Sequence, residues 1–84
     1  MNYFIIEVCC PSVSAKYDFK IPDKIIVKDL IEMIAEDVRI YESNEYLFRQ
    51  TDKLLLLDEN YVPINPLETA EQSGIKNGSI LMLI

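Results

Sequence analysis

The chain has 84 residues, half of them apolar, which fits one small folded domain and excludes an intrinsically disordered chain. Eight basic and fourteen acidic residues give a net charge of −6, which argues against a nucleic-acid backbone or an anionic membrane as a partner. The start lacks a basic region and the apolar runs are too short to span a bilayer, so we expect a cytoplasmic protein with no secretion signal and no direct membrane insertion.

The first part of the chain predicts a β-hairpin. Residues 3–10 form the first expected strand, in which Glu7 marks the wet face and the inward positions are Phe4, Ile6, Val8 and Cys10. Residues 16–21 alternate strictly between polar and apolar side chains, which places Tyr17, Phe19 and Ile21 on the inner side. The two strands are close in sequence, so we expect them to pair.

One segment, residues 27–38, has a helical period. Its apolar positions recur every three or four residues, and charged side chains occupy the opposite face. A single amphipathic helix among strands has to bury its apolar stripe against a sheet. The stripe consists of Val27, Leu30, Ile31, Ile34, Ala35 and Val38.

Three further segments predict strands. Residues 46–50 form a short strand whose register stays open, because the inward pair is either Tyr46 and Phe48 or Leu47 and Arg49. Residues 54–57 are four leucines, which predict a buried or edge strand without showing a face. Residues 80–84 form the last strand and are all apolar.

A short second helix is expected before the last strand. Asn65 is suited to cap it, Pro66 to its first position, and Glu68 follows three residues after the cap. We expect this helix to reach about residue 72 and to end at Gly74 in a left-handed conformation.

The order strand, strand, helix, strand, strand, short helix, strand resembles the β-grasp order of ubiquitin. Val27, Leu30 and Ile34 sit where the helix of ubiquitin has its core positions. Residues 73–84, with Gly74-Ile75 followed by Asn77-Gly78, and the charge pattern of residues 17–21 resemble the YukD/EsaB family, small bacterial ubiquitin-like proteins associated with type VII secretion. The resemblance implies an α+β, ubiquitin-like β-grasp fold over residues 1–84, a single domain in which a mixed sheet of about five strands packs on one main helix.

This resemblance implies a non-conjugating protein-interaction module, an accessory or regulatory component of a type VII secretion system. Conjugating ubiquitin-like proteins and sulfur carriers need a flexible tail ending in Gly-Gly, whereas Ile84 ends this sequence and Gly74 and Gly78 lie in expected turns. Two alternatives stay open: a general ubiquitin-like docking or adaptor domain unrelated to secretion, and a truncated sulfur carrier or modifier.

The residues offer little for catalysis. The chain has no histidine, which removes Ser-His and Cys-His nucleophile pairs and most metal sites. Cys9 and Cys10 are adjacent, a poor geometry for a disulfide, and we expect them to be reduced. The carboxylates on one helix face fit a solvated surface better than a metal or catalytic site: Glu32, Glu36 and Asp37. We therefore expect no catalytic residue, no cofactor, no metal and no enzymatic activity.

The last strand predicts a protein-binding surface on the sheet face turned away from the helix. If Leu81 and Leu83 face the helix, then their neighbours along the strand face outward. By resemblance, Phe48, Met82 and Ile84 occupy positions of the apolar recognition patch of ubiquitin. The expected partner is a secretion-apparatus protein or a second copy of the chain; the alternative is that these residues are scattered or covered. The predicted surface consists of Tyr3, Ile5, Phe48, Ile80, Met82 and Ile84.

Overall fold

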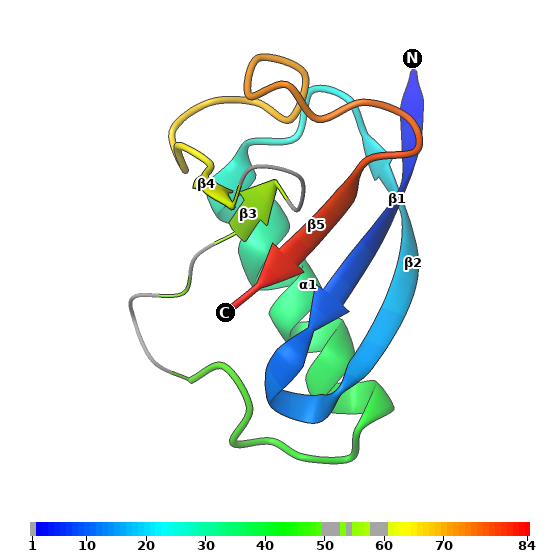
Figure 1. Cartoon of the computed structure of the whole chain (residues 1–84), viewed down its shortest axis with the longest axis vertical. Coiled ribbons are helices and arrows are strands. Elements are labelled where there is room, and N and C mark those ends of the chain that lie inside the picture. Colours follow the sequence, from blue (N-terminus) through cyan, green and yellow to red (C-terminus); the bar gives the residue numbers. More distant parts are fainter. Residues whose placement is uncertain (1, 50–52, 54, 58–60) are drawn as a thin grey trace.

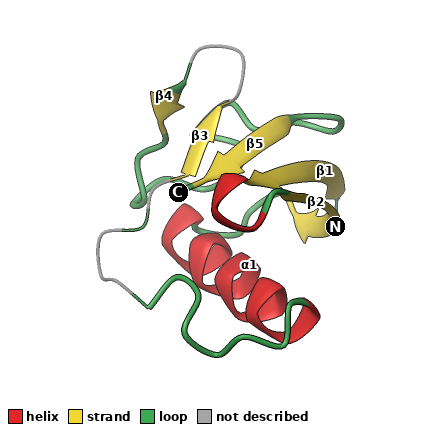
Figure 2. Cartoon of the chain, turned by 60° about the horizontal axis from the view of Figure 1, so that its bottom comes forward, coloured by secondary structure: helices red, strands yellow, loops and turns green. Residues whose placement is uncertain are grey.

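The computed structural model describes residues 2–49, 53, 55–57 and 61–84. A mixed sheet packs with one face on a single α-helix, α1 (Figures 1 and 2). The five strands lie in the order β2-β1-β5-β3-β4. This arrangement is the ubiquitin-like β-grasp fold, as predicted. The elements are β1 (Tyr3–Cys10), the 3-10 helix η1 (Pro11–Val13), β2 (Ala15–Pro22), α1 (Val27–Tyr41), β3 (Leu55–Leu57), β4 (Val62–Pro63) and β5 (Ile80–Leu83).

Strands β1 and β2 form the predicted antiparallel hairpin. Their register pairs Ile6 with Phe19 and Phe4 with Ile21, so the inward positions of both strands meet on the same face. The chain reverses through η1, and Ser14 closes the turn with a left-handed backbone at a φ of 51°. The strict alternation of β2 and the position of Glu7 in β1 thus predict correctly which face of each strand is buried.

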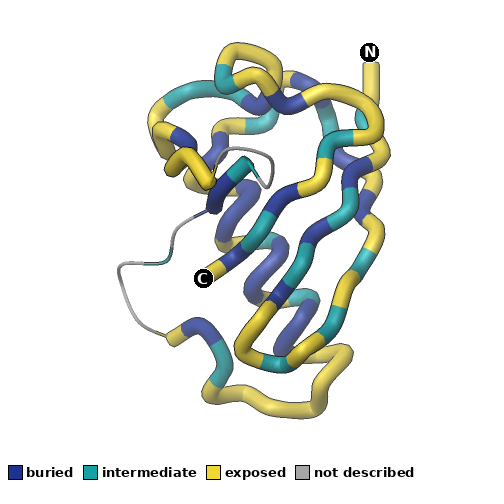
Figure 3. Tube along the Cα trace, in the orientation of Figure 1, coloured by how far each residue is buried: buried dark blue, intermediate teal, exposed yellow. Residues whose placement is uncertain are grey.

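Strand β5 lies in the middle of the sheet, parallel to β1 and antiparallel to β3 (Figure 1). Leu81 and Leu83 are fully buried on the helix side. Their neighbours along the strand are more accessible, and the alternation is visible along the tube in Figure 3. The condition set in the sequence analysis, that Leu81 and Leu83 face the helix, is therefore met.

Helix α1 buries the predicted stripe. All six of its apolar positions belong to one buried cluster together with the inward residues of β1, β2 and β5. Each large aliphatic side chain contributes roughly 1.5–3 kcal/mol on burial, before conformational entropy is counted. The helix continues to Tyr41, three residues beyond the segment with the helical period.

The N-terminus of α1 is capped by backbone rather than by a side chain. Ile26 occupies the cap position and makes no side-chain cap hydrogen bond. Instead the N–H of Val27 donates to the carbonyl of Glu68 at 2.8 Å, and that of Lys28 to the carbonyl of Pro66 at 2.9 Å. Two of the helix's four free N–H groups are thereby satisfied from a segment far along the chain.

The predicted helix over residues 66–72 is wrong, and the capping bonds explain why. This segment is a series of turns joined to the start of α1 by an isolated bridge between Ile26 and Thr69. The N–H of Ala70 also donates to the carbonyl of Ile25, at 2.8 Å. The carbonyls of Pro66 and Glu68 and the N–H of Ala70 thus form hydrogen bonds with residues 25–28, so they are not available for hydrogen bonds within a helix. The predicted left-handed turn at Gly74 is confirmed, with a φ of 94°.

The predicted strand over residues 46–50 is also wrong within its described part. Residues 45–48 form turns, and residue 50 lies outside the described residues. Arg39 donates from one guanidinium nitrogen to the carbonyls of Leu47 at 3.0 Å and Phe48 at 3.4 Å. Phe48 also has a φ of 56°, which no strand contains. The third strand is instead β3, in the predicted leucine run, whose residue 54 lies outside the described residues.

Burial of α1 can be tested with two isoleucines on opposite sides of the same helix. Ile34 is fully buried, whereas Ile40 is 64% exposed. Ile34→Ala should lower the free energy of unfolding by about 2–5 kcal/mol, because it leaves a cavity in the core. Ile40→Ala should change it by less than about 0.5 kcal/mol. Chemical denaturation measures both, and equal losses would contradict the packing of this helix.

Candidate protein-interaction surface

The outer face of the sheet carries a band of apolar side chains. Tyr3 and Ile5 of β1 are 47% and 49% exposed, and Ile80 and Ile84 are 44% and 45% exposed. Met82 lies between the last two and is half-buried. The parallel register places Ile80 beside Glu7 and Met82 beside Cys9, so both strands contribute to this face, with the half-buried Glu7 between Ile5 and Cys9 on β1. The structure thus brings together five of the six residues predicted for this surface.

Phe48, the sixth predicted residue, does not belong to the surface. Its side chain is 6% exposed and lies in the buried cluster with α1 and β5. The prediction placed it on an outward-facing strand position, but the segment is a turn held by Arg39. Neither of the two registers left open applies. Tyr46 is 79% exposed although Phe48 is in the core, and Arg49 is exposed although Leu47 is half-buried.

Leu56 joins the surface and was not predicted. Its partner in the β3–β5 ladder is Met82, so both lie on the outer side, whereas Leu55 and Leu57 face the helix. Leu56 is only 7% exposed, yet it is not part of the main core cluster. Four consecutive leucines gave no alternation from which its direction could be read.

Charged residues of β2 line one margin of this apolar face. Lys16, Asp18 and Lys20 lie opposite Cys9, Glu7 and Ile5 on the same side of the sheet. The ammonium nitrogen of Lys20 is 4.7 Å from the centre of the Tyr3 ring, a cation–π contact. Such a margin of mixed charge around apolar residues is typical of the rim of a protein interface.

The turn between residues 76 and 79 fixes the end of the surface. The N–H of Ile5 donates to Oδ1 of Asn77 at 2.8 Å, and the N–H of Gly78 donates to the carbonyl of Ile5, also at 2.8 Å. Gly78 has a φ of 87°, which favours glycine. These bonds position Ile5 and Ile80 without any contribution from a ligand.

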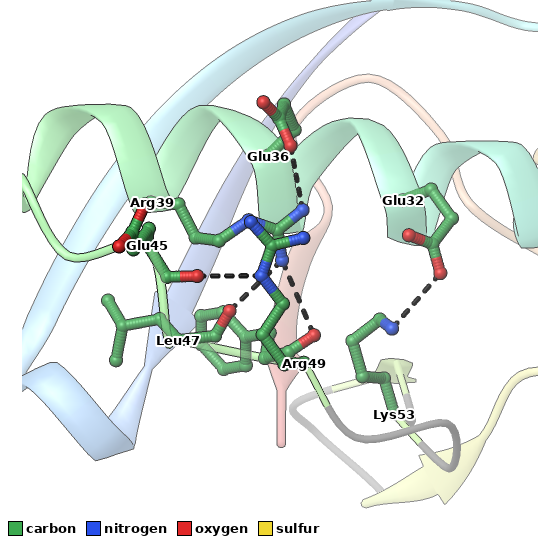
Figure 4. Close-up of polar contacts among 8 residues, drawn as sticks. Glu32, Glu36, Arg39, Glu45, Leu47, Arg49 and Lys53 are labelled. Carbon is green, nitrogen blue, oxygen red and sulfur yellow. Dashed lines mark hydrogen bonds and ion pairs between the residues drawn. The ribbon is translucent and has the colours of Figure 1, made fainter.

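A second group of polar side chains holds the segment after α1 (Figure 4). Arg39 is 8% exposed and donates to Glu36 at 2.8 Å as well as to the Leu47 and Phe48 carbonyls. Its hydrogen bond and charge hold the pKa of the Glu36 carboxyl below its usual value. Lys53 pairs with Glu32 at 3.0 Å. Two of the three helix-face carboxylates are therefore committed to structural ion pairs.

A shallow cavity of about 520 Å³ lies over this group, lined in part by Glu36, Arg39, Tyr46 and Arg49. The Nε of Arg49 donates to the Glu45 carbonyl at 2.6 Å, so this guanidinium is also used in holding the loop. The described residues include no group of three His, Cys, Asp or Glu side chains that could hold a metal ion. The lining carries two carboxylates and two guanidinium groups, and both guanidinium groups donate to backbone carbonyls of the loop after α1.

Tyr17 joins β2 to the end of α1. Its ring stacks on Tyr41 with 5.2 Å between centroids, and its hydroxyl donates to the Glu42 carboxylate. This hydrogen bond, followed by partial desolvation and the charge of Glu42, raises the pKa of Tyr17 from 10.0 to about 12. Nearby, burial raises the pKa of the Cys10 thiol to about 11, with smaller contributions from Cys9 and Glu42. Cys9 and Cys10 are not joined in a disulfide.

Known proteins resemble this chain in structure rather than in sequence. No family model and no curated protein matches the sequence. Among solved structures, the EccD5 ubiquitin-like domain from Mycobacterium xenopi matches with a TM-score of 0.80 at 11% identity, covering 100% of this chain and 94% of that one. The ubiquitin-like domain of the Mycobacterium tuberculosis type VII secretion protein EccD1 matches with a TM-score of 0.77 at 13% identity, covering 100% and 99%.

A chain in the MycP5-free ESX-5 inner membrane complex matches with a TM-score of 0.78 at 13% identity, covering 100% of this chain and 21% of that one. At these identities the comparisons establish the fold. The chain has the ubiquitin-like fold, and its structure matches the EccD5 and EccD1 ubiquitin-like domains. No helix among its described residues is both long enough and apolar enough to cross a membrane.

Because Phe48 lies in the core and not on the surface, its substitution should destabilise the fold. Phe48→Ser removes a buried aromatic ring and should lower the free energy of unfolding by about 3–5 kcal/mol. The neighbouring Tyr46 is 79% exposed, so Tyr46→Ser should leave stability nearly unchanged. Thermal or chemical unfolding measures both. A Phe48→Ser variant as stable as the unaltered protein would contradict the core assignment.

The Tyr17–Glu42 hydrogen bond predicts a loss of stability in alkali. Because the folded pKa of about 12 lies above the ordinary value of 10.0, the stabilisation is present below pH 10 and disappears as the pH rises to about 12. Glu42→Gln should lower the pKa of Tyr17 and reduce this loss. Ultraviolet titration of the phenolates, with Tyr17→Phe to assign the signal, measures the shift. Identical titrations of Glu42→Gln and the unaltered protein would contradict it.

Proposed function

We propose that this chain is a non-enzymatic, cytoplasmic protein-interaction module of a type VII-like secretion apparatus, and that it binds a protein subunit of that apparatus through the outer face of its sheet. The observation that carries the proposal is the exposure of apolar side chains on this face. Tyr3, Ile5, Ile80 and Ile84 are each between 44% and 49% exposed, and they lie on the same face of the sheet as the half-buried Met82.

The physical argument is that these side chains are positioned by the fold but not used by it. The core is closed by the opposite face of the same strands, where Ile6, Val8 and Leu81 are buried. A contiguous apolar surface on a small domain usually marks an interface, because leaving it in water forgoes roughly 25 cal/mol per Å². Aromatic and branched aliphatic residues with a charged rim are suited to burial against another protein.

The choice of partner class is supported by the structural matches. One matched domain comes from a type VII secretion protein, another is the EccD5 ubiquitin-like domain, and one matched chain belongs to the ESX-5 inner membrane complex. A ubiquitin-like domain in such a setting meets other proteins of the assembly. A general docking role outside secretion is supported by another match, the N-terminal ubiquitin-like domain of the 4931431F19Rik protein, with a TM-score of 0.75 at 13% identity and coverage of 98% of this chain and 73% of that one.

Site-specific crosslinking in cells that naturally contain the protein tests this function. A photoreactive residue at position 80 should form adducts with membrane-associated secretion subunits. The same residue at position 40, exposed on α1, is the matched control and should not. Adducts confined to proteins unrelated to secretion would favour the general docking role.

A substitution provides the corresponding measurement of affinity. Ile80→Lys should leave the unfolding midpoint nearly unchanged and weaken capture of the crosslinked partner by at least about tenfold, as expected for an interface anchor. Ile40→Lys introduces the same charge on the helix and should not affect capture. Equal capture by both variants would contradict the use of the outer face.

A further inference from the structure

Strand β2 is the edge of the sheet, and the direction of its backbone groups can be derived (Figure 1). The N–H of Asp23 donates to the carbonyl of Asn2 at 3.1 Å, just beyond the Tyr3–Pro22 pair. Along an antiparallel ladder, hydrogen-bonded pairs alternate with pairs whose backbone groups point away. The residues of β2 that direct their N–H and C=O toward β1 are therefore Ala15, Tyr17, Phe19 and Ile21.

Lys16, Asp18 and Lys20 consequently direct their backbone groups away from the sheet. The hydrogen bonds of β1 on the side away from β2 agree with this assignment. The N–H of Glu7 donates to the carbonyl of Ser79 at 3.0 Å, and the carbonyl of Ile5 accepts from the N–H of Gly78, so Ile5 and Glu7 direct their backbone groups away from β2. Within the part of the chain that the structure describes, nothing pairs with the outward N–H and C=O groups of the three β2 residues. Such an edge is a template for an added strand.

The side chains of these three residues restrict which strand can be added. They lie on the outer face in the order Lys16, Asp18, Lys20. Asp18 also lies directly opposite Glu7 of β1, a like-charge pair that destabilises the ladder unless a positive charge is nearby. A strand that places a cation beside Asp18 relieves this repulsion, and one that also places an anion beside Lys20 pairs the charge of that lysine.

A second copy of β2 meets this requirement in one register. With the two-fold axis at Phe19, Asp18 lies opposite the partner's Lys20, and Lys20 lies opposite the partner's Asp18. With the axis at Asp18, two aspartates face each other and Lys16 faces the partner's Lys20. The first register gives two complementary pairs, and the second gives only like-charge pairs. An axis at Tyr17 also pairs Asp18 with the partner's Lys16, but only residues 15–19 of the two strands then overlap, whereas residues 16–22 overlap with the axis at Phe19. The axis at Phe19 therefore combines charge complementarity with the longer ladder.

We infer that the chain associates with a second copy of itself through antiparallel pairing of its β2 edges, with the two-fold axis at Phe19. The hydrogen-bonded pairs are Asp18 with the partner's Lys20 and the symmetric equivalent. This contact is separate from the outer apolar face, which stays accessible in both copies. The lysine–tyrosine contact of Lys20 leaves further donors of its ammonium group for the partner's Asp18.

Charge exchange tests the pairing and its register. Sedimentation equilibrium should show the unaltered chain dimerising with increasing concentration. Asp18→Lys and Lys20→Asp each convert both complementary pairs into like-charge pairs and should raise the dissociation constant by at least about tenfold. An equimolar mixture of the two variants restores both pairs and should form a heterodimer. The double variant Asp18→Lys/Lys20→Asp should dimerise like the unaltered chain.

The control and the contradicting outcomes are equally specific. Lys28→Asp on α1 changes the net charge of −6 by the same amount as Lys20→Asp, so an equal loss of association in both would contradict strand pairing. A monomer at all concentrations up to the millimolar range, or no heterodimer in the mixture of folded variants, would overturn the proposal. Amide hydrogen exchange at Lys16, Asp18 and Lys20 should slow on dimerisation; slowing at Ile80 and Met82 instead would assign association to the outer face.

Discussion

The apolar stripe of α1 and the inward side chains of the central strands occupy one buried cluster, and this contact decides which way every strand faces. Because side chains alternate along a strand, placing Ile6, Val8 and Leu81 against the helix leaves Ile5 and Ile80 on the other side. The single helix covers one face of the sheet (Figure 2). An exposed apolar outer face is therefore a consequence of the same packing that stabilises the core.

Where the sequence has a strong period, the fold follows from it. The stripe of α1, the alternation of β2 and the direction of Leu81 and Leu83 all depend on side-chain burial, and each is predicted correctly. The outer positions of β1 and β5 follow from the same alternation. The binding role of these positions is a separate matter that burial alone does not decide.

The two wrong elements fail for a shared reason: distant hydrogen bonds override local signals. Residues 65–68 have the pattern of a helix start, but the carbonyls of Pro66 and Glu68 accept from the N-terminus of α1. Residues 46–50 have the composition of a strand, but Arg39 binds the carbonyls of Leu47 and Phe48. Local propensities are weak compared with such tertiary contacts. The sequence also does not indicate which carbonyl groups a buried arginine near the end of a helix will bind.

The proposed pairing of two β2 edges would determine how the outer faces of the two copies are oriented and how far apart they lie. A two-fold axis between antiparallel strands runs perpendicular to the sheet, so the outer faces of both copies point the same way. From β5 of one copy to β5 of the other there are five strand spacings, a distance of about 24 Å at roughly 4.8 Å per spacing. A protein with two suitably spaced sites can bind both faces at once, and its second contact is then governed by effective concentration. In the proposed dimer each face alone need bind such a protein only weakly, which is compatible with the small size of the apolar face.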